Sequence, residues 1–578
     1  MPTGHESKSE GRWTRRQKLA GLAIVVLHAL VLFHQSGDLM TRGHNGWNSA
    51  AYQLSARNSL RFELLFPLQY YTGIANPGNG GVYTHHPVAM HVHNTAAMWL
   101  FGDDEATIRG VAAFHGVLAL IALMFFIGRW WGPRRALLAG AAYSWLPIVV
   151  IYGNMANHVS GYLLYTLLSF HAYFRYVDAA AEADGEGGER PGRLRWFLAL
   201  LLFFAIAGVW DWPANYAAVG IALHWFVRNL RAKSSKLRGW LELFGYCIVV
   251  LAVFGGHFLL VHLYSGGLEE LFHTIGARQS SGGMSFSRHL RIVPALMFTW
   301  PVLAIVAAWI VAFFVKAARR RARRRDLFTV VIFVGGITHY VVFRESAVVH
   351  SFWAWHACAA VAIALMEFAA FAAARIGPRL SSDAARRWIA PLCAAAVMLP
   401  LVARNVQLSR DARSVGGAMW FVRPIRTDEP SPYDSGRDLL EFAERVNELT
   451  ERDTGVLVAE SILQLQPEPR FFTTLDRDTR TIASAPMQPP PNGPGVGWVF
   501  VGRRDRISLS RRRALAQAWK YREYGNFVLV DFRLATRDIE VYRRDHADFS
   551  LAYAYWRSPY EGPFEYVRDE EAEAALAE

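Results

Sequence analysis

The sequence predicts a helical membrane protein with about eleven transmembrane helices, followed by a small soluble α/β domain. The first observation is composition, because 53% of the 578 residues are hydrophobic and the chain contains 20 Trp and 36 Phe. Such a composition is typical of a chain with lipid-facing surface. The second observation is a series of long apolar segments separated by short, arginine-rich loops. The third is a change to soluble-protein composition after residue 404.

Eleven segments have the length and composition of membrane spans. A span needs about 20 mostly apolar residues, because only a helix satisfies its own backbone hydrogen bonds within lipid. The segments cover residues 19–35, 110–128, 136–152, 158–176, 196–210, 213–230, 240–263, 292–316, 327–342, 352–374 and 388–404. Asp211, Trp212 and Pro213 divide the fifth segment from the sixth, and this pair could instead be one kinked span with a re-entrant piece.

Basic residues mark every second loop between these segments. The clusters lie at residues 12–18, 129–135, 190–195, 228–238, 316–325 and 375–387. Because Arg and Lys in short loops mark the cytoplasmic side, residues 1–18 are predicted to be cytoplasmic and the end of the chain extracytoplasmic. The same pattern explains the net charge of +13 without nucleic acid as a partner. No small-residue cleavage site follows Phe33, which favours a retained anchor over a signal peptide.

Residues 36–109 of the predicted membrane domain 19–404 form one long loop on the extracytoplasmic side. This loop is too polar to span and too hydrophobic for a linker, which is typical of amphipathic helices at the membrane surface. The other outer loops cover residues 154–158, 211–212, 265–291 and 344–350. Chemically rich outer loops opposite basic inner loops indicate a site that faces outward. His91 and His93 are expected to be solvated there, and the acidic residues from Asp103 onward to cap the next span.

Residues 405–578 are predicted to form an extracytoplasmic α/β domain. Apolar residues at helical spacing indicate a helix at 438–450, and a second helix is expected at 508–521. Runs typical of buried strands lie at 456–460, 497–503 and 526–532. This alternation of helices and strands predicts a small α/β domain.

Three stretches of the long outer loop resemble the GT-C class of membrane glycosyltransferases. They read WNSAAYQLSARN at 47–58, YTHHP at 83–87 and LFGDDEATIRG at 100–110. Their order and spacing are similar to the protein O-mannosyltransferase and aminoarabinose-transferase branch of that class. The positions that match the motifs of this branch are Tyr52, Arg57, Tyr83, Pro87, Phe101, Gly102 and Arg109.

The resemblance implies the GT-C fold in a multi-pass protein of the bacterial inner membrane. It implies a glycosyltransferase that moves a sugar, with inversion, from a polyprenyl-phosphate carrier to a lipid, glycan or protein acceptor on the extracytoplasmic face. Its partners would be that sugar donor, an acceptor of unknown kind and membrane lipids. Two alternatives stay open: a catalytically inactive relative that binds carrier lipid or a partner, and a lipid or solute transporter. A transporter usually has internal repeats and a polar site near the bilayer midplane, which the sequence does not indicate.

Arginines of the outer loops are candidates for binding the carrier phosphate. The phosphate becomes more anionic as the sugar leaves, and a guanidinium can bind it through two hydrogen bonds. Arg57, Arg278 and Arg344 are the candidates on that side. The alternative is that each one only reaches toward lipid headgroups.

The residue that would activate the acceptor departs from the family pattern. The family places an aspartate there, and counting back four residues from Tyr52 leads to Asn48, which cannot accept a proton in this role. In bacterial relatives of a second pattern the aspartate would fall at His44. A neutral imidazole is a competent base, and Asp38 could orient it or act alone. The alternative is that His44 caps or packs, and that catalysis has been lost.

The resemblance also implies a place for a divalent metal ion, because the aminoarabinose branch has an acidic residue near YTHHP that helps to hold one. His85 takes that position here. With His86 and His350 it could bind a divalent ion, either Zn²⁺ or else Mg²⁺ or Mn²⁺. The alternative is that these histidines are hydrogen-bonded structural residues. The three cysteines lie in apolar runs, so a cysteine-rich zinc site is not expected.

Four further polar residues are predicted to line the substrate pocket: Tyr83, His158, Asp211 and Glu345. An ionisable residue such as Asp211 between apolar segments favours a function, although helix capping before proline explains it equally well. Glu345 could simply form an exposed ion pair with its neighbour Arg344, which would contribute little.

Overall fold

The computed structural model describes most of the chain, in two compact units. The described residues are 13–34, 36–37, 44–62, 69–70, 82–83, 86–186, 192–231, 236–265, 267–279, 297–344, 347, 350–414, 436–451, 454–459, 462, 471, 474–475, 477, 479–482, 485–486 and 497–535. The first unit, called the membrane unit below, comprises residues 1–37, 84–97 and 106–411. The second unit comprises residues 38–83, 98–105 and 412–578.

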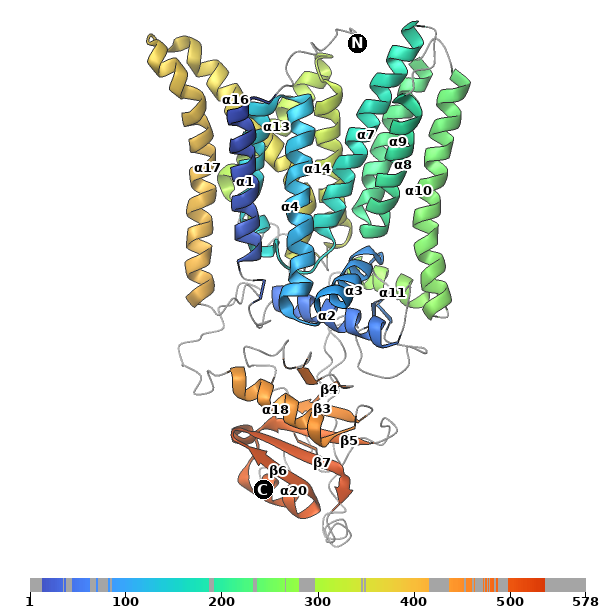
Figure 1. The fold of residues 1–578 in the computed structure, drawn as a ribbon, viewed down its shortest axis with the longest axis vertical. Coiled ribbons are helices and arrows are strands. Elements are labelled where there is room, and N and C mark those ends of the chain that lie inside the picture. The colour runs from blue at the N-terminus through green and yellow to red at the C-terminus, as the bar shows by residue number, and fades with distance from the viewer. Residues whose placement is uncertain are drawn as a thin grey trace. The chain divides into compact units, whose positions relative to one another are not determined.

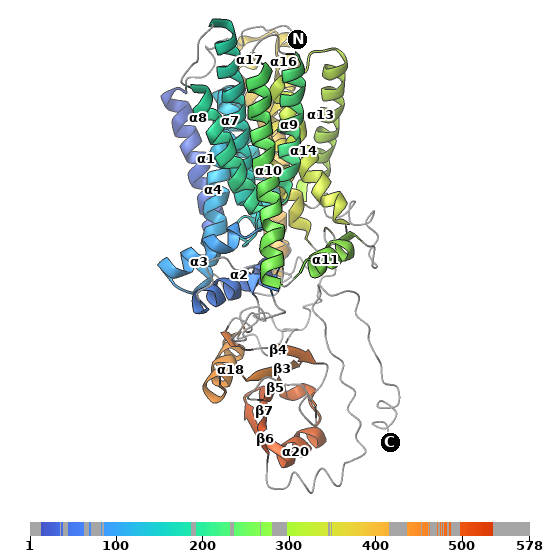
Figure 2. The same cartoon turned by 90° about the vertical axis from the view of Figure 1, so that its right-hand side faces the viewer.

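Helices build the membrane unit (Figure 1). They are α1 (Arg15–Phe33), α4 (Glu105–Trp130), α5 (Pro133–Ser144), α6 (Pro147–Tyr152), α7 (Val159–Glu186), α8 (Gly192–Trp210), α9 (Pro213–Arg231), α10 (Lys236–Ser265), α11 (Glu269–Gln279), α13 (Trp300–Ala318), α14 (Arg324–Val342), η1 (Ser351–Ala357), α16 (Cys358–Ile376), η2 (Gly377–Arg379) and α17 (Asp383–Ser414). The long helices run alongside one another in both side views (Figures 1 and 2). Helix α3 (Ala89–Phe101) begins in this unit.

Eight of the described helices are long and apolar enough to cross a membrane, which confirms a multi-pass helical protein. Every expected apolar segment contains a helix, but α7 and α9 are not among these eight. The segment expected at 136–152 is broken into α5 and α6, which have only 12 and 6 residues. The break precedes Pro147, a residue that cannot continue a helix but is well suited to begin one. The count of eleven spans is therefore not confirmed.

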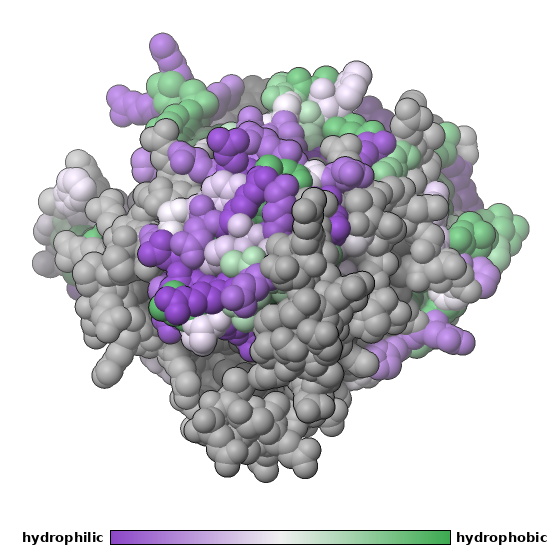
Figure 3. Space-filling model, turned by 90° about the horizontal axis from the view of Figure 1, so that it is seen from below, coloured by the Kyte–Doolittle hydropathy of each residue, from purple (hydrophilic) through white to green (hydrophobic). Residues whose placement is uncertain are grey.

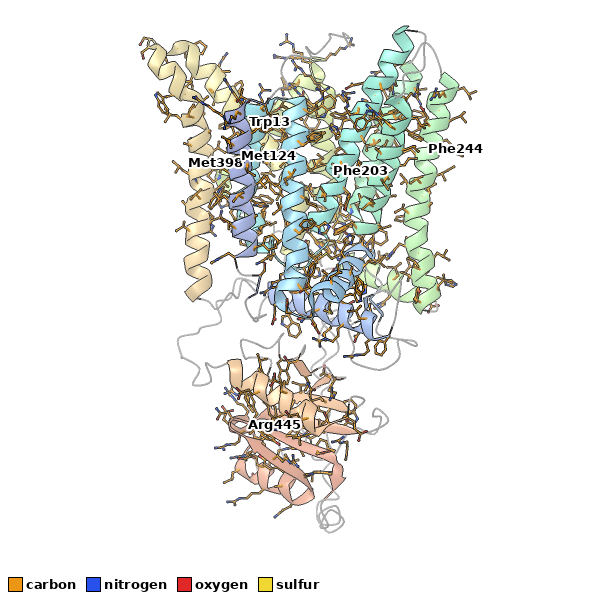
Figure 4. All side chains as sticks on the ribbon, in the orientation of Figure 1. Trp13, Met124, Phe203, Phe244, Met398 and Arg445 are labelled. Atoms are coloured by element: carbon orange, nitrogen blue, oxygen red, sulfur yellow. The ribbon has the colours of Figure 1, made fainter. Side chains whose placement is uncertain are left out.

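Side chains on opposite sides of these helices differ in character. Phe244 of α10 points away from the bundle and is 65% exposed (Figure 4), as a lipid-facing residue would be. Met124 of α4, in contrast, is buried. A Cβ added to Gly140 of α5 would stand 2.7 Å from the Met124 sulfur, so glycine is what allows α5 to approach α4 this closely.

The long outer loop contributes a helix and a small hairpin to the second unit. Helix α2 (His44–Arg61) precedes strands β1 (Gln69–Tyr70) and β2 (Val82–Tyr83), which pair antiparallel. The buried polar residues of α2 are Ser49, Gln53, Ser55, Asn58 and Ser59. The buried side of α2 is thus more polar than expected for an amphipathic helix at a membrane surface.

A five-stranded sheet forms the core of the C-terminal part of the second unit. Its strands are β3 (Gly455–Ala459), β4 (Thr479–Ile482), β5 (Trp498–Arg503), β6 (Trp519–Tyr524) and β7 (Phe527–Ala535), in the spatial order β4-β3-β5-β7-β6. The first three in that order are parallel, and the β5–β7 and β7–β6 pairs are antiparallel. Helix α18 (Gly436–Leu449) packs on one face of the sheet and α20 (Leu509–Ala518) on the other. The predicted α/β domain is therefore confirmed.

One element of this domain was predicted too long. The helix expected at 508–521 ends at Ala518, and the residues that follow form β6, an edge strand paired with β7. Gly525 has a φ of 54° in the turn between the two strands, which glycine adopts without strain. The described surface around α20 and β6 is mainly hydrophilic in Figure 3, as suits an edge strand with partly exposed polar side chains.

Candidate functional site

A buried aspartate lies where α8 ends and α9 begins. Asp211 is only 1% exposed, and its Oδ1 accepts a hydrogen bond of 2.8 Å from the backbone N–H of Trp212. The short turn ends at Pro213, which begins α9. Because a buried carboxylate is costly unless it is paired, the partners of Asp211 decide what it can do.

The imidazole of His356 is the closest of these partners. Its Nε2 lies 2.8 Å from Asp211 Oδ2, and its Nδ1 lies 2.6 Å from the carbonyl oxygen of Trp353. A carbonyl oxygen only accepts, so Nδ1 must carry a hydrogen. The Nε2 contact then needs a second hydrogen, which either the imidazole or the carboxyl supplies. Asp211 and His356 therefore share one proton.

Electrostatics favour the charged form of the Asp211 carboxyl. Burial raises the pKa of the Asp211 carboxyl, but the hydrogen bond from His356 and the nearby imidazole of His86 outweigh burial and hold this pKa well below its usual value. The pair thus contains a buried carboxylate that accepts from His356. Such a carboxylate is a weak base toward a substrate, and its chemistry suits the fixing of neighbouring rings.

Further histidines surround the pair. His86 Nδ1 is 3.4 Å from Asp211 Oδ1, and the His86 ring stacks on His158 with 4.3 Å between centroids. The ring of His339, on α14, lies 5.5 Å from that of His356. All these side chains are buried. We call the group the Asp211 cluster: Asp211, His86, His158, His339, His350, Trp353 and His356.

Trp353 lies at the centre of the cluster. Its ring centroid is 4.6 Å from His339, 5.1 Å from His350 and 6.2 Å from His86. Trp353 belongs to η1, so this short 3-10 helix carries both the central ring and His356. The apolar ring excludes water from the histidines around it, which strengthens the polar contacts made there.

Two local features of the sequence fix the positions of these side chains. A Cβ on Gly336 of α14 would stand 2.7 Å from the backbone nitrogen of Ala357, so only glycine allows η1 to lie against α14. Asn157 accepts a hydrogen bond of 2.8 Å from the Val159 N–H and caps α7, which places His158 just before that helix.

The structure brings together four residues that the sequence singled out: His86, His158, Asp211 and His350. It adds His339 and His356, which sequence analysis missed because both lie within apolar segments. The available signal was the run FWAWHA at 352–357. It contains His356, which follows His350 by six residues. The contact between His356 and Asp211 joins residues that are 145 positions apart, so no local pattern announces it.

The described part of the chain does not form the expected metal site. Among described residues, no group of three His, Cys, Asp or Glu side chains could hold a metal ion. His86 instead faces Asp211 and stacks on His158, and His85 lies outside the described residues. The two described histidines of the expected set, His86 and His350, both pack around Trp353.

In the second unit, Arg57 contacts an acidic residue. Its Nε donates to Asp103 Oδ2 over 2.5 Å, and Gln53 Nε2 donates to Asp103 Oδ1 over 2.7 Å. Arg57 and Asp103 are partly exposed, at 18% and 35%. The Asp103 carboxylate thus holds α2, and capping of the next span by the acidic residues from Asp103 onward stays a prediction. A phosphate that binds Arg57 must share the guanidinium with this carboxylate.

The remaining candidates are only partly placed. Asn48 is half-buried on α2, and Arg344 is exposed just after α14. Outside the described residues lie Asp38, His85, Glu345 and the side chains of His44, Tyr83 and Arg278. Their roles stay predictions.

The two histidines expected to be solvated are not. His91 is fully buried on α3, on the side that also buries Met90 and Asn94. His93 is half-buried, with Nδ1 2.7 Å from the carbonyl oxygen of Ala89 and its ring 4.6 Å from Trp210. Packing against neighbouring helices gives these histidines little access to water, and single-residue polarity does not reveal this.

Comparisons with known proteins rest on structure. No protein-family model matches the chain, and no curated protein matches it. Among solved structures, ArnT from Cupriavidus metallidurans bound to undecaprenyl phosphate is similar, with a TM-score of 0.51 and 17% identity over 88% of this chain and 97% of that one. The apo state of the same protein gives 0.50 and 16%, over 89% and 98%.

A second protein from a different lineage is also similar. The archaeal oligosaccharyltransferase AglB from Archaeoglobus fulgidus, in complex with an inhibitory peptide and a dolichol-phosphate, gives a TM-score of 0.52 and 12% identity over 94% of this chain and 76% of that one. At such identities the similarity concerns the fold. The expectation raised by the loop motifs is confirmed at that level: the chain has the fold of the GT-C membrane glycosyltransferases.

Proposed function

We propose that the protein transfers a sugar from a polyprenyl-phosphate carrier to an acceptor on the extracytoplasmic face of the bacterial inner membrane. The observation that carries the proposal is the shared fold over nearly the whole chain with ArnT, whose structure holds undecaprenyl phosphate. The structure of AglB with a dolichol-phosphate supports the same class of carrier. The acceptor is a lipid, a glycan or a protein.

The proposed reaction is a single displacement with inversion. An acceptor hydroxyl oxygen attacks the anomeric carbon, and the bond from that carbon to the phosphate oxygen breaks, with its electron pair leaving on the polyprenyl phosphate. His44 takes the hydroxyl proton, oriented by Asp38. Arg57, Arg278 and Arg344 stabilise the charge that grows on the phosphate.

The Asp211 cluster has a positioning role in this proposal. Asp211 holds the imidazole of His86 next to its carboxylate. In the proposed site, the substrate pocket is lined by Tyr83, His158 and Glu345. Side chains that are ordered before the substrate binds can orient the reacting atoms without a rearrangement of the site.

The test measures transfer by the full-length protein in lipid nanodiscs. Donors are a panel of radiolabelled polyprenyl-phosphate sugars, the acceptor is an envelope extract, and the readout is label in the acceptor together with released polyprenyl phosphate. Loss of a general base should lower the rate by about 100-fold or more, so we expect this for His44→Gln. Asp38→Asn should show a smaller loss. His273→Gln removes an exposed histidine of α11 and serves as the matched control. Unchanged transfer in both test variants would show that the base is assigned wrongly.

A second candidate is a relative that binds carrier lipid without transfer. Asn48 at the family's aspartate position and the ion pair that occupies Arg57 favour it. This candidate expects undecaprenyl phosphate to bind and to raise the unfolding temperature, while no donor of the panel is consumed. Turnover of any donor excludes it.

A further inference from the structure

A cluster of cations and aromatic rings lies at the basic end of α4, α7 and α8, far from the Asp211 cluster. We call it the His171 cluster: Arg129, Trp130, His171, Arg175, Arg195 and Trp196. The His171 ring lies 6.3 Å from Trp130 and 5.7 Å from Trp196. Its three helices run beside one another in both side views (Figures 1 and 2).

The arginines are held in place by stacking on the indoles. The guanidinium carbons of Arg175 and Arg195 each lie 5.3 Å from the Trp196 ring centroid, and that of Arg129 lies 5.7 Å from the Trp130 centroid. A stacked guanidinium keeps its N–H groups directed outward at the ring edge. Three helices thus present donors around one imidazole.

His171 carries a buried ring nitrogen that no described residue bonds. The residue is 8% exposed, and its Nδ1 has no hydrogen-bond partner among the residues that the structure describes. Buried polar atoms normally find a partner, so an acceptor from outside the protein is expected here. An anionic oxygen could bind His171 and the guanidiniums of Arg129 and Arg195 together.

Nearby carboxylates are engaged by other arginines. Asp178, one turn beyond Arg175 on α7, lies 2.9 Å from Arg324. Glu242 accepts a hydrogen bond of 3.1 Å from Arg193 Nε. The positive charge of the His171 cluster is therefore not cancelled by these two groups.

Apolar side chains continue from the cluster along the outer surface of two helices. On α4, Phe114, Ile121 and Phe125 are 54%, 43% and 54% exposed, and the Phe125 ring is 4.7 Å from His171. On α8, Leu198 and Leu202 are 53% and 57% exposed, on the same helical face as Arg195. A ligand with an anionic head and apolar chains matches this arrangement.

We propose that the His171 cluster binds the phosphate of an anionic phospholipid whose acyl chains lie along α4 and α8. The site is distinct from the proposed transfer site, because Asp211 directly follows the end of α8 and lies 15 positions after Trp196, or about 22 Å at 1.5 Å per residue. The lipid belongs to the leaflet on the basic side of the bundle. The proposal does not depend on sugar transfer.

The test is native mass spectrometry of the full-length protein with added phosphatidylglycerol or phosphatidylcholine. We expect Arg129→Gln, Arg175→Gln and Arg195→Gln together to weaken the tightest phosphatidylglycerol binding by at least about tenfold, because each cation near an anionic lipid is worth about fivefold. Binding of phosphatidylcholine should not change. His171→Phe keeps a ring but removes the donor, and should weaken phosphatidylglycerol alone by about fivefold.

The control is a triple variant of exposed arginines at the same end, Arg134→Gln, Arg135→Gln and Arg319→Gln, for which less than a twofold change is expected. Equal losses in both triple variants, or no loss in either, overturn the proposal. A third result would also overturn it: undecaprenyl phosphate binds more tightly than phosphatidylglycerol, and the cluster variant abolishes that binding. The cluster would then be a carrier site. If the triple variant of the cluster does not fold, the single variants Arg195→Gln and His171→Phe decide the question. Both should fold, because Arg195 is exposed and the phenylalanine ring fills the place of the His171 ring.

Discussion

The buried contact between Asp211 and His356 depends on a single shared proton. Nδ1 of His356 donates to the Trp353 carbonyl oxygen, so only Nε2 can form a hydrogen bond with the Asp211 carboxylate. Removing the imidazole leaves a buried carboxylate with one fewer donor, whereas changing the carboxylate to an amide leaves a group that can donate to a neutral imidazole. The two partners are therefore not equivalent.

This asymmetry predicts the ranking of two substitutions. His356→Leu should destabilise the protein by about 3–5 kcal/mol, as expected when one partner of a buried ion pair is lost. Asp211→Asn should cost only about 1–2 kcal/mol, because the amide N–H donates to Nε2 while Nδ1 keeps its bond. Thermal unfolding of the purified variants in the same detergent measures both changes.

The double variant completes this experiment. Asp211→Asn with His356→Leu removes the uncompensated charge and should be more stable than His356→Leu alone. If His356→Leu proves to be the milder single change, the shared proton is assigned wrongly.

Arg57 illustrates how a sequence prediction can name the right kind of residue and miss its partner. The guanidinium was assigned to phosphate from its motif, and the structure places a carboxylate, Asp103, on it. The two residues are 46 positions apart, in a loop whose course the sequence does not define. Charge and spacing therefore identified the arginine but could not show its competition with Asp103.

At the scale of the element, η1 determines whether the Asp211 cluster can form. This short 3-10 helix carries Trp353 and His356, and it reaches α14 only where Gly336 removes a side chain. The neighbouring glycine is different, since a Cβ on Gly335 would meet only the Tyr216 Cβ at 3.5 Å, an ordinary contact.

These adjacent glycines give a matched pair of substitutions. Gly336→Ala should destabilise the protein by about 1–3 kcal/mol, because a methyl group 2.7 Å from backbone cannot be accommodated by a side-chain movement. Gly335→Ala should be neutral or stabilising by up to about 1 kcal/mol, because alanine favours the helix more than glycine does. Unfolding temperatures of the two variants test the pair, and similar values for both would mean that η1 does not rest on α14 as described.

Elements with a strong periodic pattern could be predicted from the sequence, and contacts between them could not. The helix α18 and the buried strands β3, β5 and β7 follow from apolar spacing alone. The strand β6 was mistaken for the end of a helix, because its pairing with β7 depends on a turn at Gly525. The break between α8 and α9 could be located at Asp211, but its partner His356 lies in a different apolar segment.

For the whole molecule, the arginine-rich loops predict which side of the membrane each segment faces. The net charge of +13 is distributed so that alternate loops carry the basic clusters. If this arrangement sets the orientation, residues 232–235 lie in the cytoplasm and the C-terminal sheet lies outside.

Cysteine labelling tests this orientation. In a background with Cys247, Cys358 and Cys393 changed to alanine, Ser510→Cys on the exposed start of α20 should react with an impermeant maleimide in intact spheroplasts. Ser234→Cys should react only after the membrane is permeabilised. The opposite pattern would place the outer loops in the cytoplasm and remove the basis of the proposed transfer reaction.

Gly336 also has an evolutionary consequence. Any homologue that keeps η1 against α14 must keep glycine at this position, because no other amino acid lacks a Cβ. Lineages that have replaced this glycine should have replaced the histidine equivalent to His356 as well. Joint inheritance of these two positions would show that the glycine and the buried pair are kept together.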